Sequence, residues 1–247
     1  MNRSTDSRGA GAKRVAIIQS SYIPWKGYFD IINQVDEFIL YDDRQYTRRD
    51  WRNRNLIKTA HGLHWLTIPV QVKGRYTQRI DETLIGEPGW AERHWKTIEQ
   101  AYSAAPHFRT YRDAIGELYL KCSAHRLSDV NRRFLEAISG WLGIRTPFSW
   151  STDYEASGDR TARLVSLCQS AGAGEYLSGP AARSYIDSAL FQEAGLRLTY
   201  MDYSGYPEYP QLHGPFEHGV TILDLLFNAG ADAPRYMKSF ASHTVAS

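Results

Sequence analysis

The stretch RVAIIQSSYIPWKGYFDIINQVDEFILY, residues 14–41, decides the fold class of this chain. It opens with Arg14–Gln19, a short apolar run rich in β-branched residues, which predicts a buried strand. Loop-forming residues follow, and Tyr28–Val35 then repeats apolar side chains at helical spacing. Phe38–Tyr41 is a second apolar run of the strand type. This order of strand, loop, helix and strand predicts the start of a parallel α/β sheet.

The rest of the chain continues the alternation and adds a block of helices. Further strands are predicted at Phe148–Ser151, Tyr176–Gly179 and Leu196–Met201, with a hairpin over residues 56–72. Helices are predicted at Gly89–Ala104, Phe108–Cys122, Ser128–Trp141, Thr161–Ala171, Tyr185–Ala194 and Thr221–Phe227. Ser128 and Asp129 are expected to cap their helix, and Gly230 stands just beyond the last one. We therefore expect an α/β fold: a mostly parallel, Rossmann-like sheet with flanking helices and a helical insertion.

Composition along the chain predicts one principal domain. Residues 1–13 are small and polar, which predicts a disordered N-terminal lead. Residues 14–230 are expected to form a single α/β domain with a helical insertion at about 88–145, because no linker separates the parts. Residues 231–247 are expected to be a C-terminal tail.

Bulk composition excludes few classes of protein. The chain has 247 residues, of which 43% are hydrophobic, enough for one large core. Its formal net charge of +2 gives no general field that would demand a nucleic-acid partner. No apolar run reaches membrane-spanning length and residues 1–13 do not resemble a signal peptide, so we expect no membrane partner and a cytoplasmic location. The two cysteines, Cys122 and Cys168, lack metal-ligand spacing.

A charge-dense stretch follows directly on the second predicted strand. Residues 42–55 read DDRQYTRRDWRNRN, with five arginines and three aspartates. The carboxyl end of a buried strand is where open α/β sheets bind ligands, and guanidinium groups recognise carboxylates and phosphates. The alternative is a solvated surface loop with local ion pairs. The preceding strand, together with Tyr46 and Trp51 inside the stretch, favours a binding site.

The predicted substrate site gathers this stretch with two loops that follow strands. Arg52 and Arg54 are expected to clamp a phosphate or carboxylate, with Asn53 and Asn55 holding hydroxyl or amide groups. Leu177–Pro180 is either a second anion site or an ordinary capped turn. The predicted substrate-binding residues are Gln19, Tyr22, Trp25, Lys26, Gly27, Tyr28, Asp42, Gln45, Trp51, Arg52, Asn53, Arg54, Asn55, Ser178 and Gly179.

Three residues are predicted to be catalytic. Asp43 or Asp50 would bind a substrate amine, and His94, near a predicted helix start, would remove its proton as general base. The alternative for His94 is a capping or half-buried histidine. Cys168 is either an acyl-carrying nucleophile or, as its apolar surroundings favour, an inert buried thiol. No metal site is expected, because no two histidines share metal-ligand spacing on one helix.

The loop Pro24–Tyr28 joins the first strand to a helix, where an amino terminus can hold a phosphate or carboxylate. Its spacing resembles the nucleotidyltransferase and class I synthetase loop, which reads Pro-His-x-Gly-His. Trp25 and Tyr28 stand where that loop has histidines, which argues against adenylyl transfer by that mechanism. The alternative is a tight strand-to-helix turn anchored by Trp25.

Five segments together are similar to the WbqC-like family. They are Gln19–Phe29, Tyr41–Asn55, Trp65–Val70, Tyr176–Gly179 and Asp224–Gly230, and the similarity runs from about Val15 to Gly230. The string Asp50-Trp-Arg-Asn-Arg-Asn55 is its most specific part, while Arg44 stands where the resemblance leads us to expect a small apolar residue. The resemblance implies a bacterial transferase of the O-antigen or natural-product type that modifies a sugar amine. It carries over no established catalytic residue.

The leading hypothesis is therefore a biosynthetic transferase that moves an acyl or aminoacyl group to the amine of an amino sugar or natural-product intermediate. The substrate is a small molecule, with a sugar nucleotide among the candidates, and the donor carrier is open between a carrier protein and a tRNA. One alternative is an ATP-dependent ligase or nucleotidyltransferase with a degenerate histidine loop. Another is a non-catalytic sugar-nucleotide binding protein. The cofactor and the oligomeric state stay open.

Overall fold

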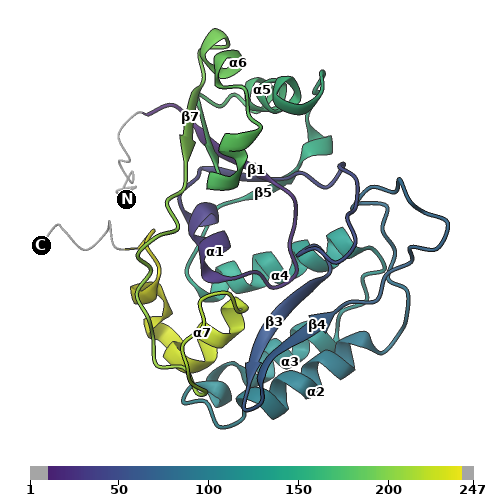
Figure 1. Cartoon of the computed structure of the whole chain (residues 1–247), viewed down its shortest axis with the longest axis vertical. Coiled ribbons are helices and arrows are strands. Elements are labelled where there is room, and N and C mark those ends of the chain that lie inside the picture. The colour runs from purple at the N-terminus through teal and green to yellow at the C-terminus, as the bar shows by residue number, and fades with distance from the viewer. Residues whose placement is uncertain (1–10, 241–247) are drawn as a thin grey trace, which may run out of the picture.

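The computed structural model describes residues 11–240 and contains a five-stranded sheet in which every pairing is parallel (Figure 1). The strand order is β5-β2-β1-β6-β7. The strands are β1 (Arg14–Ile18), β2 (Glu37–Leu40), β5 (Phe148–Trp150), β6 (Glu175–Ser178) and β7 (Arg197–Tyr200). The helices are α1 (Lys26–Asn33), α2 (Trp90–Tyr102), α3 (Phe108–Leu120), α4 (Leu127–Trp141), α5 (Arg160–Ser170), α6 (Ser188–Glu193) and α7 (Ile222–Ala229). The predicted α/β fold is confirmed.

The strand order contains one reversal of direction. The chain moves outward from β1 to β2 and β5, then returns to the other side of β1 and moves outward again through β6 and β7. The two halves meet between β1 and β6. Ligands of open α/β sheets bind at the carboxyl ends of the strands beside such a switch point.

Alternating side chains of the central strands divide the core into two clusters. Val15, Ile17 and Ile39 pack with Leu167 and Phe191 from α5 and α6. The strand residues between them, such as Ala16 and Phe38, pack on the other face in the larger cluster, together with α1, α4 and α7. Figure 1 shows α5 and α6 on one side of the sheet and α1 and α4 on the other. Helices therefore cover both faces of the sheet, as is usual for parallel sheets.

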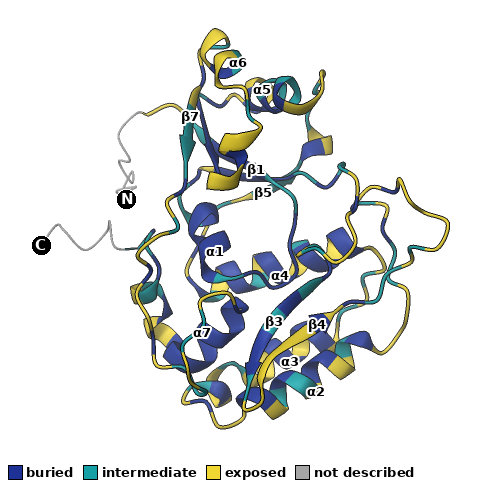
Figure 2. Cartoon of the chain, in the orientation of Figure 1, coloured by how far each residue is buried: buried dark blue, intermediate teal, exposed yellow. Residues whose placement is uncertain are grey.

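A two-stranded antiparallel hairpin lies outside the main sheet and packs on α2. Its strands are β3 (Arg54–Thr59) and β4 (Gly62–Thr67). Figure 2 shows β3 largely buried and β4 largely exposed. Helices α2, α3 and α4 follow between the hairpin and β5, as the sequence predicts. No helix within residues 11–240 is both long and apolar enough to cross a membrane.

Two local expectations are wrong. Asp187 caps α6 through the amide of Ala189, and a short 3₁₀ helix, Pro180–Ser184, precedes it, so the helix is shorter than predicted from Tyr185. Ser128 does not cap α4; it lies in the first turn, and its hydroxyl donates to Asp42 at 2.6 Å. Tertiary bonding overrides the capping preference at this position.

The predicted lead and tail extend beyond the described residues, at 1–10 and 241–247. Gly230 follows α7 with a φ of 59°, and the 3₁₀ helix Gly230–Tyr236 continues from it. Ala233 and Met237 belong to the larger core cluster. The described part of the predicted tail therefore packs against the domain.

Candidate functional site

A cavity with two adjoining compartments lies at the switch point of the sheet. Its walls include Ile18 and Gln19 at the end of β1, Tyr41 after β2, and Gly179 after β6. One compartment has a volume of about 940 Å³, and we name it the arginine compartment after Arg44, Arg52 and Arg160. The other has a volume of about 540 Å³, and we name it the aromatic compartment after Trp25, Tyr28, Trp51 and Tyr203. Ile18, Trp25, Tyr28, Arg52, Ala181 and Tyr203 line both.

Arg52 stands at the boundary of the two compartments and is only partly used by the protein. Its Nη1 donates to the carbonyl oxygens of Gln19, at 2.8 Å, and Ser20, at 3.0 Å. Its Nε is buried without a hydrogen-bond partner, and the nearest carboxylate oxygen, on Asp50, lies 3.8 Å away. The side chain is only 12% exposed. The Nη2 of Arg52 makes no hydrogen bond to a described residue and is not among the buried unpaired atoms, so this nitrogen is the donor suited to bind an anion.

The loop after β1 is held by the charge-dense stretch. The Asn55 amide donates to the carbonyl oxygens of Tyr22 and Ile23, both at 3.0 Å, and the Tyr22 amide donates to the Trp51 carbonyl. Ile23 is kept at a φ of 37°, which is unfavourable for a β-branched residue. Asn55 borders the aromatic compartment, but its amide group is committed to this loop.

Asp42 ties the same loop to α4 instead of facing the cavity. Its carboxylate accepts from the Ser20 amide at 2.7 Å and from the Ser128 hydroxyl at 2.6 Å. Burial raises the pKa of Asp42 above its usual range, while these hydrogen bonds act against that rise. The predicted substrate-binding residue is therefore a positioning residue in this structure.

Lys26 and Gly27 also have structural contacts. Lys26 donates to the Pro207 carbonyl at 2.7 Å, and its Nζ lies 5.1 Å from the ring centroids of both Tyr206 and Tyr209. Burial lowers the pKa of Lys26 to about 8. A Cβ atom at Gly27 would lie 2.3 Å from the Trp25 ring, so glycine is required for that ring to cover the helix start. Neither residue lines the cavity.

His94 lies away from the cavity, in an aromatic cluster of the helical block. Its Nε2 is 3.1 Å from the Thr67 carbonyl, which can only accept, so Nε2 carries the proton. Its Nδ1 then accepts from the Tyr22 hydroxyl at 2.9 Å, and Tyr22 accepts from Tyr119 at 2.6 Å. Burial lowers the pKa of His94 to about 4. The structure does not bring His94 together with the arginines.

The two aspartates proposed to bind an amine are also occupied elsewhere. Asp43 bonds Arg44, Ser151 and Arg163, and these contacts lower its pKa against the effect of burial. Asp50 accepts from the Thr47 hydroxyl and the Trp51 amide, which lowers its pKa in the same way. Neither borders either compartment, and among the described residues lining the cavity none is acidic.

The structure brings together about half of the predicted binding residues. Those that line the cavity are Gln19, Trp25, Tyr28, Gln45, Trp51, Arg52, Asn55 and Gly179. Those that do not are Tyr22, Lys26, Gly27, Asp42, Asn53, Arg54 and Ser178. Asn53 donates to the Ile68 carbonyl, and Arg54 lies over the exposed Trp65 ring with Nη2 bonded to the Arg49 carbonyl.

Several cavity residues are absent from the sequence-based assignment. Arg44 lies within the charge-dense stretch, but Arg160, Tyr203 and His218 come from distant segments. Tyr203 meets the Trp25 ring edge to face, with centroids 5.1 Å apart. The only signal for Tyr203 and His218 is the aromatic and proline-rich composition of residues 202–219. His218 is the one histidine among the described lining residues.

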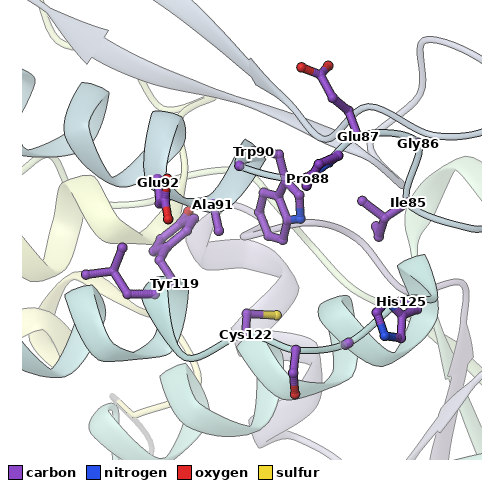
Figure 3. A pocket seen from close by; sticks show the side chains of 14 residues that line it. Ile85, Gly86, Glu87, Pro88, Trp90, Ala91, Glu92, Tyr119, Cys122 and His125 are labelled. Carbon is purple, nitrogen blue, oxygen red and sulfur yellow. The ribbon is translucent and has the colours of Figure 1, made fainter.

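A second cavity, of about 370 Å³, lies beside the helical block (Figure 3). Trp90 and Tyr119 reach it from α2 and α3, and Cys122 and His125 from the segment after α3. No residue of the 42–55 stretch lines it. Within residues 11–240, no group of three or more His, Cys, Asp or Glu side chains is placed to hold a metal ion. Cys168 is buried in the smaller core cluster, and burial raises its pKa to about 12.

Comparison with known proteins identifies relatives of this chain. The family model described as the WbqC-like protein family matches residues 19–236. An uncharacterized protein of Mycobacterium tuberculosis (strain ATCC 25618 / H37Rv) is 57% identical over 226 residues, which covers 92% of this chain and 98% of that protein. No solved structure matches this chain.

Proposed function

The chain belongs to the WbqC-like protein family, and we propose that it transfers an acyl or aminoacyl group to the amine of an amino sugar or a comparable biosynthetic intermediate in the bacterial cytoplasm. The observation that carries this proposal is the cavity at the switch point. It combines a rigid guanidinium, Arg52, with aromatic walls, which is the arrangement expected of a small-molecule site.

In the proposed reaction, the amine nitrogen attacks the carbonyl carbon of an activated ester or thioester. A carbon–nitrogen bond forms, the bond to the oxygen or sulfur leaving group breaks, and the amine proton must be released. The amine proton passes to solvent in this proposal. His94 lies away from the cavity, and His218 borders only the aromatic compartment.

The test is a transfer assay read by mass spectrometry. Purified protein receives an amino-sugar nucleotide and, in separate reactions, acyl thioesters, charged carrier protein and aminoacyl-tRNA. We expect one donor to yield an acceptor heavier by the acyl group, and Arg52→Ala to reduce the rate at low acceptor concentration by roughly tenfold or more. Arg54→Ala, which lies outside both compartments, is the matched control. Equal rates for both variants would exclude this cavity as the site of transfer.

A second candidate is a sugar-nucleotide binding protein without catalytic activity, which the absence of acidic side chains among the described lining residues favours. Tight binding without turnover in every reaction would support it. The ATP-dependent alternative has less support. Lys26 faces the 202–219 loop, so it is not free to neutralise phosphates at the start of α1.

A further inference from the structure

The aromatic compartment is suited to a planar ring. Trp25, Tyr28 and Tyr203 form its walls, and Trp51, which is 44% exposed, stands at its edge. Apart from Arg52 and His218, no side chain in its lining carries an ionisable acid or base of the Asp, Glu, Lys, Arg or His type. Flat aromatic walls favour stacking with planar ligands such as nucleobases.

The arginine compartment is suited to several negative charges. Arg44 bonds Asp43 through Nη2 at 3.0 Å, and Asp43 also pairs with Arg163, so the carboxylate is shared between two guanidinium groups. Arg160 is exposed and lines the same compartment. The first residues of α5, Arg160 and Thr161, line the same space and add the positive end of that helix. Three guanidinium groups in one lining favour a ligand with several anionic oxygens over a single carboxylate.

Arg52 lines both compartments, so a single ligand that fills both would contact its guanidinium group. Such a ligand needs a planar ring at one end and a chain of anionic oxygens at the other. Each compartment alone has the volume of a small-molecule site. A small aromatic acid would therefore fill only one of the two. A nucleoside diphosphate has this shape and charge.

We propose that the cavity binds the nucleoside diphosphate part of a sugar nucleotide, with the base in the aromatic compartment and the diphosphate on Arg44, Arg52 and Arg160. The sugar then extends from the second phosphate. The inference rests on the proposed function, because it places the nucleoside diphosphate of the acceptor in the same cavity. Binding of the diphosphate can nevertheless be measured without any acyl donor.

The experiment is isothermal titration calorimetry on the whole chain. The probes are uridine diphosphate, adenosine diphosphate, the two matching nucleosides, and inorganic pyrophosphate. We expect one diphosphate to bind at least tenfold more tightly than its nucleoside and than pyrophosphate, because only it fills both compartments. Diphosphates that bind no better than pyrophosphate, or that do not bind, would overturn the inference.

Variants locate the binding. Arg52→Ala is expected to weaken the diphosphate by roughly ten- to a hundredfold, as for other hydrogen bonds to charged groups. Because Arg52 also holds the loop after β1, Arg160→Ala provides a second variant with an exposed side chain, and thermal melts check folding. Arg54→Ala is the matched control, since it lies outside both compartments. Equal losses for Arg54 and for the two cavity arginines would place the ligand elsewhere.

The two proposals fail in different ways. Diphosphate binding with no transfer from any donor would leave this inference standing and remove the transferase. Transfer to an amine acceptor without diphosphate affinity would remove only the inference.

Discussion

Arg52 and His94 are both largely buried polar residues, yet their nitrogen atoms have different surroundings. Both ring nitrogens of His94 have protein partners, Tyr22 and the Thr67 carbonyl. The Nη2 of Arg52 has no partner among the described residues, and the side chain borders a cavity. A buried polar group with all its partners inside the protein stabilises the fold. One with an unused donor at a cavity wall is available to a ligand.

His94→Ala is expected to have the largest effect on stability and so to distinguish the aromatic cluster around His94 from the cavity around Arg52. The variant removes a side chain that packs against Trp90 and leaves the Tyr22 hydroxyl without its acceptor. We expect the free energy of unfolding to fall by about 3 kcal/mol, from packing and the lost hydrogen bonds. Urea titration measures this, with His61→Ala as control. Unchanged stability with loss of turnover would restore His94 as the general base.

A pH effect of similar size is expected from the same residue. The pKa of His94 is about 4 when folded, against about 6.5 for an unfolded histidine. Between these values the unfolded chain binds a proton that the folded chain does not, so stability falls as pH drops through this window, by up to about 3 kcal/mol. Urea titrations from pH 7 to 4 should show a steeper loss for the wild type than for His94→Ala. Parallel curves would contradict the assignment.

A smaller effect is expected from Tyr22→Phe. This variant keeps the ring but removes the hydroxyl that donates to His94 and accepts from Tyr119. The two orphaned groups should cost about 2 kcal/mol of stability, with ligand affinity unchanged. Tyr76→Phe, on a residue that is 75% exposed, is the control. If the affinity for the nucleoside diphosphate fell by more free energy than the stability, Tyr22 and its aromatic cluster would be part of the ligand site.

The smallest effect is expected from Arg54→Ala. Arg54 lies 4.1 Å from the Trp65 ring centroid, and Trp65 is 40% exposed. Removing this contact should lower the free energy of unfolding by less than about 1 kcal/mol. Chemical denaturation would detect a larger loss, and that result would show that Arg54 contributes to the fold beyond its contact with Trp65.

The sheet could be predicted from the sequence because its signals are local. Val15, Ile17 and Ile39 belong to short apolar runs, and those runs alternate with helical patterns. The helical stripe of α2 also carried information about His94: Trp90 and Ile98 lie four residues before and after it and are buried on the same face. That spacing favours a core histidine, whereas we predicted a general base from the position of His94 near a helix start.

The composition of the site could be predicted only in part. The run of arginines indicated a binding stretch, but whether Arg52 or Arg54 faces inward depends on contacts with Gln19 and Trp65 that no local pattern encodes. Tyr203 and His218 reach the cavity from a loop that Asp30 and Asp224 hold through the hydroxyls of Tyr206 and Tyr209. Such long-range packing is set by the tertiary fold.

The most direct test is a crystal structure of the chain with a bound nucleoside diphosphate. We expect the base among Trp25, Tyr28 and Tyr203 and the phosphates on Arg44, Arg52 and Arg160. Electron density for the ligand in the second cavity, beside Trp90 and Cys122, with the Arg52 guanidinium unoccupied, would contradict this assignment.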